Sequence, residues 1–212
     1  MVSAPRLQCA FFGLLLAAAT ASAQTTTPLV PPPDNWTHGT TLNVFAGGAT
    51  GGHDTAGAAG GAFGWELTPR TSVEGSGTWF DWGPSAHAFT ANITTQVALA
   101  TARPAVPFLA VGVGLYHATF NRLDTAIPTF YRRRMPAVMS EGSTTAIFTD
   151  PTVAGGGGVT IFLSRHWTLR PEVIATVVLR DSRSMVVTTG ALRLGYHFED
   201  HPVTPLTHFG DR

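Results

Sequence analysis

The stretch that decides the fold is Met185 to Phe198, which reads MVVTTGALRLGYHF. Even-numbered positions are largely apolar, and odd-numbered positions carry both basic side chains, Arg193 and His197. Successive side chains of a β-strand point to opposite faces, so a period of two separates these sets. The pattern predicts a long strand with one face for apolar surroundings and the other for a polar interior.

Two further segments show the same division. The proposed outward sets are Trp167, Leu169, Pro171, Val173, Ala175, Val177 and Leu179, and Phe89, Ala91, Ile93, Thr95, Val97 and Leu99. The opposite faces are mostly Thr, Asn, Gln, Ala and Gly, with scattered charges. A soluble antiparallel sheet would turn a highly charged face to water, whereas a narrow barrel lumen is filled by small side chains. The small, mostly uncharged side chains of these faces therefore favour a narrow barrel lumen.

Eight strands are expected, at about 40–50, 55–67, 71–82, 87–101, 106–120, 150–164, 166–180 and 184–199. They are too long for a typical soluble sandwich and suit tilted strands that cross a membrane. The sequence predicts an all-β fold, an eight-stranded antiparallel up-and-down transmembrane β-barrel over residues 39–199. Both termini would be periplasmic, and residues 121–149 would form the one long outer loop. An aromatic girdle is expected from strand-end residues: Trp65, Trp79, Trp82, Trp167, Tyr196 and Phe198.

The chain begins with a predicted export signal at residues 1–23, in which Arg6 precedes an apolar run and Ala21 to Ala23 form a small-residue cleavage site. Residues 24–38 are Pro- and Thr-rich and predict an extended linker, and residues 200–212 form a tail. The only cysteine, Cys9, would leave with the signal.

Composition argues against nucleic-acid binding and favours a membrane protein. Charged residues make up 12% of the chain, and basic and acidic residues are equal at 13 each, so no electrostatic footprint for nucleic acid is present. Glycine is abundant at 23 residues. Few charges and many glycines without a long apolar run favour a membrane β-barrel.

The sequence resembles the eight-stranded outer-membrane barrels of the OmpA transmembrane-domain and OmpX type. The matching segments are residues 106–114 (VPFLAVGVG), the glycine run 155–158, Trp167 to Glu172 and the closing residues 194–198 (LGYHF). This resemblance implies an outer-membrane location. Two departures are the residues after Phe198, where many such barrels end, and the lack of room for a peptidoglycan-binding domain.

Charged residues on the proposed inward faces form a predicted lumen ion-pair cluster. Its members are Glu66, Glu74, Arg170, Glu172 and Arg193. Opposite charges in a narrow lumen would pair, because an unpaired buried ion costs several kcal/mol, on the order of the effective desolvation penalty. The cluster is interpreted as a structural plug, with a gate or proton path as the alternative.

The long loop carries Arg132, Arg133 and Arg134, a possible extracellular binding site for lipopolysaccharide phosphates or an acidic partner, with a solvated loop tip as the alternative. Expected partners are outer-membrane lipid including lipopolysaccharide and the outer-membrane assembly machinery. The surface partner is unidentified, and a monomer is expected.

No catalytic residue, metal site or cofactor is predicted. Some barrels that modify lipid A use a His-x-Ser pair with a carboxylate, and His166, Thr168 and Glu172 are only faintly similar because Thr replaces Ser. The favoured function is non-enzymatic, structural or surface-interacting through outer loops. The alternatives are a small-solute porin, a lipid A acyl hydrolase and a soluble periplasmic barrel.

Overall fold

The structure is a computed structural model that describes residues 39–100, 104–124, 127–132, 144–164, 166–180 and 184–199. The proposed signal peptide, linker and tail lie outside the described residues. The elements are β1 (Thr40–Gly51), β2 (Asp54–Thr68), β3 (Thr71–Asp81), β4 (Ala86–Ala98), β5 (Ala105–Asn121), α2 (Thr129–Arg132), β6 (Thr145–Phe162), β7 (Trp167–Val178) and β8 (Met185–His197). Within these residues, no helix has the length and hydropathy to span a bilayer.

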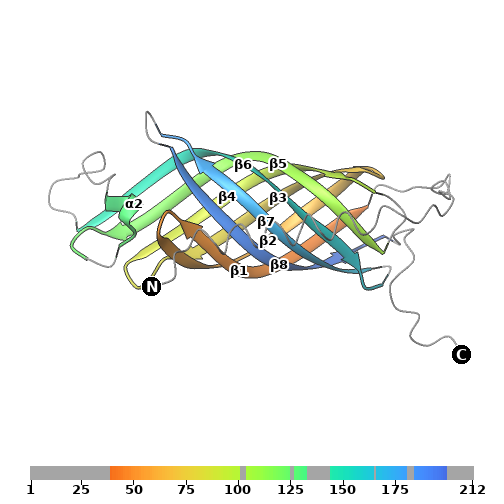
Figure 1. Cartoon of the computed structure of the whole chain (residues 1–212), viewed down its shortest axis with the longest axis horizontal. Coiled ribbons are helices and arrows are strands. Elements are labelled where there is room, and N and C mark those ends of the chain that lie inside the picture. Colours follow the sequence, from red (N-terminus) through yellow and green to blue (C-terminus); the bar gives the residue numbers. More distant parts are fainter. Residues whose placement is uncertain are drawn as a thin grey trace, which may run out of the picture.

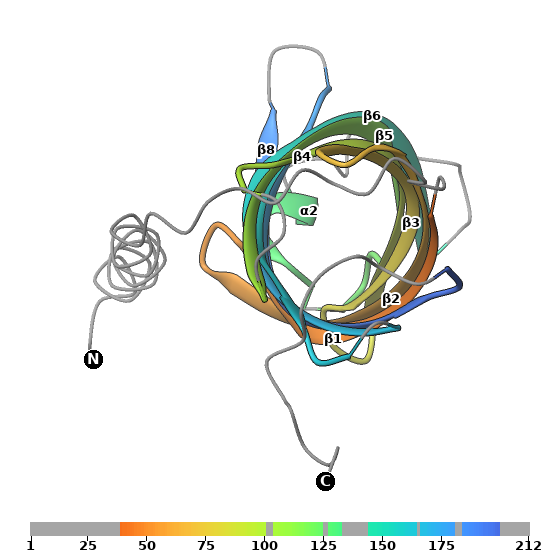
Figure 2. The ribbon, with the colours of Figure 1, turned by 90° about the vertical axis from the view of Figure 1, so that its right-hand side faces the viewer.

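The eight strands form a closed barrel in which each strand pairs antiparallel with its neighbours in sequence order. β1 and β8 close it, in a register that runs from Thr41 opposite His197 to Gly51 opposite Val187. The strands run obliquely along the long axis (Figure 1), and the ring is seen end-on in Figure 2. The predicted fold class is confirmed. We call the end that contains Thr40 and His197 the terminal end, and the end that contains the β5–β6 connection the loop end.

The period-two faces lie as the sequence predicted. Ile93 and Leu192 are 64% and 52% exposed on the outside, while their neighbours Thr94 and Arg193 are buried inside. Trp65, Trp79, Trp167 and Phe198 are exposed, as a girdle requires. Trp82 is different: it is buried and packs inside the barrel against Phe80 and Tyr131. The girdle assignment was wrong for Trp82.

β6 begins at Thr145, five residues before the expected start at 150. The physical reason is that alternation continues through this segment: Ala146 and Phe148 are buried, while Ile147 is exposed. β5 supplies its ladder partner, since Asn121 pairs with Thr145. The expected loop 121–149 is therefore shorter, and it also contains the turn α2.

Two kinds of filling occupy the barrel interior. A buried apolar cluster with members from every strand and from residues 127 and 131 lies toward the loop end. Charged and amide side chains lie toward the terminal end, where Asn43, Glu74 and Arg170 are buried. Close packing there depends on Gly60, because a Cβ at this position would lie 2.5 Å from the Phe45 ring. The lumen thus contains side chains along its length.

Candidate functional site

Four of the predicted charged residues meet inside the barrel. Glu74 comes from β3, Arg170 and Glu172 from β7, and Arg193 from β8. Their side chains are only 4% to 9% exposed. We call these four residues the charged layer.

Each arginine of the charged layer contacts both glutamates. Glu74 accepts hydrogen bonds from Arg170 Nη2 at 2.7 Å and from Arg193 Nη1 at 2.8 Å. Glu172 lies 2.6 Å from Arg193 Nε and 3.3 Å from Arg170 Nε, between carboxylate oxygens and guanidinium nitrogens. The result is a closed ring of alternating charge with two cations and two anions.

Strand register explains why both glutamates are needed. Arg170 and Arg193 are direct cross-strand partners on β7 and β8, and like charges in that position repel. Glu172 lies two residues along from Arg170 on the same inward face and contacts both guanidinium groups. Local repulsion between the arginines is therefore offset by the carboxylate beside them.

Glu74 reaches the arginines from the opposite wall. β3 and β7 are four strands apart in a ring of eight, so they face each other across the lumen. The 2.7 Å contact between Glu74 and Arg170 consequently crosses the barrel interior. A direct contact between opposite walls leaves side chains, not an open channel, at this depth.

Polar and aromatic neighbours complete the surroundings of the charged layer. Gln96 Oε1 accepts from Arg170 Nη1 at 3.0 Å, and Asn43 Nδ2 donates to Glu74 at 3.5 Å. The Arg193 guanidinium lies 4.2 Å from the centre of the Phe45 ring, and Arg170 lies 5.2 Å from that of Phe108. Sequence reasoning did not name these neighbours, although Gln96 was on a predicted inward face.

Glu66, the fifth predicted member, lies apart from the charged layer. In the β2–β3 ladder, Glu74 is opposite Gly64, so Glu66 is two residues closer to the terminal end. Its carboxylate is 3.7 Å from Nδ1 of His197. The shared inward face was predictable, but depth along the lumen depends on strand stagger.

At the terminal end, Glu199 joins the first and last strands. Its carboxylate accepts from the Thr40 backbone N–H at 2.6 Å and from the Thr40 hydroxyl at 3.0 Å. Burial alone would raise the pKa of Glu199, but the Thr40 hydrogen bonds outweigh it and hold the pKa below its usual range. The carboxylate form therefore stabilises this junction.

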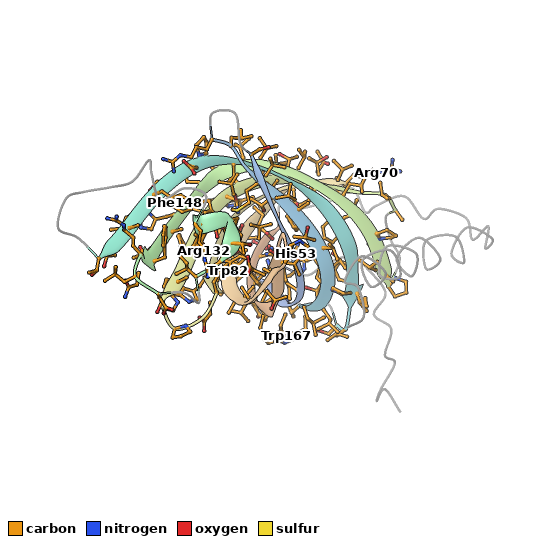
Figure 3. The ribbon with its side chains drawn as sticks, turned by 60° about the vertical axis from the view of Figure 1, so that its left-hand side comes forward. His53, Arg70, Trp82, Arg132, Phe148 and Trp167 are labelled. Atoms are coloured by element: carbon orange, nitrogen blue, oxygen red, sulfur yellow. The ribbon has the colours of Figure 1, made fainter. Side chains whose placement is uncertain are left out.

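Arg132 is the described member of the predicted loop site, and Arg133 and Arg134 lie outside the described residues. Arg132 is exposed at the end of α2, directly after the fully buried Tyr131. It lies at the loop end, whereas Arg70 lies at the other end of the barrel (Figure 3). The arginine run thus begins directly after Tyr131, whose side chain is packed in the barrel interior.

The three residues of the hydrolase alternative have separate surroundings. His166 Nδ1 is 2.9 Å from the His197 carbonyl oxygen, while Glu172 belongs to the charged layer. Thr168 faces inward opposite Gly195. Across the described ranges, no group of three His, Cys, Asp or Glu side chains has the arrangement of a metal site.

No protein-family model and no curated protein matches the chain. Solved structures do. Neisserial surface protein A is 9% identical, with a TM-score of 0.56 over 76% of this chain and 97% of that one. The N-terminal β-barrel of Pseudomonas aeruginosa OprF is 14% identical, with a TM-score of 0.51 over 76% of this chain and all of that one (100%). The chain therefore has the fold of the small eight-stranded outer-membrane β-barrels.

Proposed function

We propose that this protein is a bacterial outer-membrane barrel with a closed lumen, which acts without catalysis at the cell surface through its outer loops. The observation that carries the proposal is the charged layer, in which Glu74 and Arg170 meet from opposite walls. An eight-stranded barrel is just wide enough for its own side chains, so a layer of this kind obstructs solute passage. A partner can therefore reach only the outer surface of the barrel and its loops.

The fold and the lipid-suited face support the membrane location. Large apolar side chains such as Val111, Val113 and Ile93 are more than 60% exposed on the outer surface, an arrangement that suits lipid. We propose that the terminal end lies in the periplasm and the loop end outside the cell. The export signal and its cleavage are part of the proposal.

The arginine run is the proposed recognition element. Arg132 is exposed beyond a buried anchor, and Arg133 and Arg134 follow it in sequence. Guanidinium groups pair well with phosphates, so the phosphorylated headgroups of lipopolysaccharide are the proposed ligand.

The test is binding of purified lipopolysaccharide to the folded full-length protein in detergent, with Arg132, Arg133 and Arg134 replaced by Ser. Binding should weaken and lose most of its salt dependence in the triple variant. Arg70→Ser removes a charge at the opposite end and should leave binding unchanged. Equal binding by the triple variant and the unmodified protein would reject the arginine run as the site.

The porin and acyl hydrolase alternatives are tested separately. Bilayer conductance addresses the porin, and mass spectrometry of lipid A with and without the gene addresses the acyl hydrolase. We expect unchanged lipid A, because His166 and Glu172 contact different partners.

A further inference from the structure

The connection between β5 and β6 does not simply project from the barrel. Its residues Ile127 and Tyr131 are 2% and 0% exposed, which is the burial of a protein core. In the end-on view α2 lies inside the ring of strands (Figure 2). We call residues 127–132 the strap.

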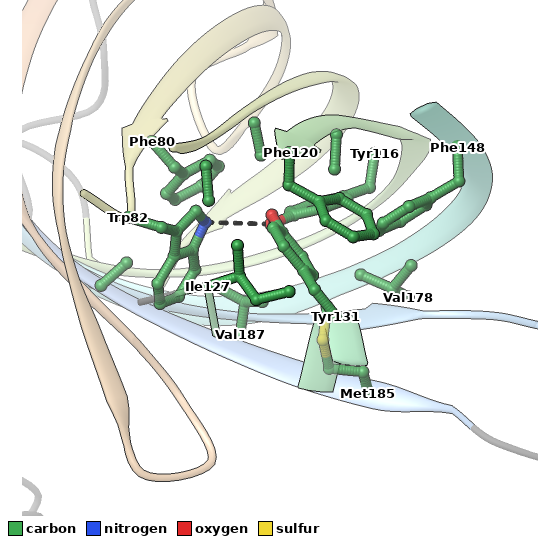
Figure 4. Packing of buried hydrophobic residues seen from close by; sticks show 14 of the residues in the cluster. Phe80, Trp82, Tyr116, Phe120, Ile127, Tyr131, Phe148, Val178, Met185 and Val187 are labelled. Carbon is green, nitrogen blue, oxygen red and sulfur yellow. Dashed lines mark hydrogen bonds between the residues drawn. The ribbon is translucent and has the colours of Figure 1, made fainter. Parts of the chain in front are cut away.

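The strap packs into an aromatic cluster formed by Phe80, Trp82, Tyr116, Phe120, Phe148 and Tyr131. The Tyr131 ring stacks on Phe120 at 5.0 Å between ring centres and meets Phe148 edge-on at 5.4 Å. The Tyr131 and Tyr116 hydroxyls are 2.7 Å apart, and Trp82 Nε1 donates to Tyr116 at 3.1 Å. These contacts join the strap to β5 and β6 and to the end of β3 (Figure 4).

Hydrogen bonds secure the strap on the far wall. Asp54, the first residue of β2, accepts from the Thr129 backbone N–H at 2.8 Å and from its hydroxyl at 2.7 Å. The chain enters this connection from β5, which is three strands from β2 and four from β1 in the ring of eight. Asn121, at the end of β5, and Thr129, bound to Asp54 of β2, therefore lie on different sides of the barrel mouth.

The barrel wall has a position shaped for the strap. Gly51 ends β1, and a Cβ there would lie 2.8 Å from the Phe130 ring and 3.1 Å from the Trp82 ring. Phe130 itself contacts Trp82 at 5.1 Å and Tyr131 at 4.4 Å between ring centres. A side chain at Gly51 would occupy the space that Phe130 fills.

We infer that the strap is a built-in stopper at the loop end, forming a second seal in series with the charged layer. The two seals differ in chemistry, since one is apolar and aromatic and the other ionic. They also come from different depths, because the cluster includes Val178 and Met185, at the ends of β7 and β8 opposite the end where the charged layer lies. Opening either seal alone leaves the lumen closed.

The test is single-channel recording in planar lipid bilayers with three variants of the full chain. The strap variant replaces Ile127, Phe130 and Tyr131 with Ser, the layer variant replaces the four charged residues with Ser, and the combined variant carries both changes. Heat-modifiable gel migration verifies that each barrel is folded. Only the combined variant should give stepwise current proportional to voltage. Conduction by either single-seal variant, or a folded but silent combined variant, would overturn the inference.

A cross-linking measurement covers the case in which a variant does not fold. Asp54→Cys with Thr129→Cys, in a chain carrying Cys9→Ser, should form a disulfide on mild oxidation because these side chains are in hydrogen-bond contact. Ser85→Cys with Thr129→Cys is the matched control, since Ser85 hydrogen-bonds Asp124 instead, and it should stay reduced. A folded Asp54–Thr129 pair that stays reduced, or equal cross-linking of both pairs, would reject the strap.

The inference builds on the proposed closed lumen, but the two fail differently. Steady conduction by the unmodified protein would refute the closed lumen of the proposed function. Absence of the Asp54–Thr129 cross-link would refute the strap and leave the charged layer intact.

Discussion

The two halves of this lumen are filled by opposite chemistries. Toward the terminal end, charged side chains from β3, β7 and β8 meet across the interior. Toward the loop end, aromatic side chains of the wall pack around Tyr131 of the β5–β6 connection. The charged layer is built by strand residues alone, while the aromatic cluster also includes Ile127 and Tyr131 of the β5–β6 connection. The comparison indicates that the ionic half depends on pairing, and the aromatic half depends on the position of one loop.

The largest effect is expected in the charged layer. Glu172→Ala leaves Arg170 and Arg193 adjacent without the carboxylate between them, and removing one partner of a buried ion pair costs about 3–5 kcal/mol. Urea unfolding of the barrel in detergent measures this cost. Glu66→Ala is the matched control, because Glu66 lies outside the charged layer and should cost much less. Equal losses for the two variants would contradict the layer as the main ionic support.

The aromatic half should respond to one hydroxyl group more than to another. Tyr116→Phe removes the group that accepts from Trp82 and bonds Tyr131, so two buried polar groups lose this partner, at about 1–3 kcal/mol each. Tyr131→Phe leaves the Trp82 bond to Tyr116 in place and should cost about half as much. The same urea titration, with tryptophan fluorescence, compares them. A larger loss for Tyr131→Phe would show that Tyr116 is not the centre of the network.

Gly51, at the end of β1, is the position in the barrel wall against which Phe130 of the strap packs. Gly51→Ala should cost about 1–3 kcal/mol through overpacking against Phe130, measured by thermal unfolding. Gly190→Ala is the control, because no atom lies within 4 Å of a Cβ there and the residue faces outward. If the two variants unfold alike, Phe130 does not occupy the site beside Gly51.

The smallest effect is expected at the junction of β1 and β8, which belongs to neither the charged layer nor the strap. The folded pKa of Glu199 is lowered, so its stabilisation is fully present above the unfolded value of 4.5 and is lost as the pH falls through the folded pKa. Glu199→Gln should lower stability slightly at pH 7 and flatten the decline below about pH 4.5. Unfolding measured from pH 7 to pH 3 checks this. A variant with the unmodified pH profile would show that the hydrogen bonds between Thr40 and the Glu199 carboxylate contribute nothing to stability.

Sequence reasoning reached the ionic half more fully than the aromatic half. Alternation fixed which charges point inward, and Glu74, Arg170, Glu172 and Arg193 do meet. Depth was not available from alternation, so Glu66 was grouped with them although strand stagger places it nearer the terminal end. A period-two pattern reports the face of a residue but not its height along the barrel.

The aromatic half was missed because its central residue is not in a strand. Tyr131 lies in a segment expected to be a loop, and no periodicity links it to Phe120 or Phe148. One signal was present: Tyr116, Phe120 and Phe148 share the inward parity of their strands, so a group of large rings faced one end of the lumen. Their partner, Tyr131, has no sequence signal of its own, because its position depends on contacts with residues distant in the chain.

Conductance of the unmodified protein in a planar bilayer is the most direct measurement, because side chains fill both halves of the lumen. We predict baseline current at all applied voltages from barrels shown to be folded by heat-modifiable migration, with a known porin as the positive control in the same bilayer. Steady, voltage-proportional current from the unmodified protein would contradict a lumen filled by the charged layer and the strap.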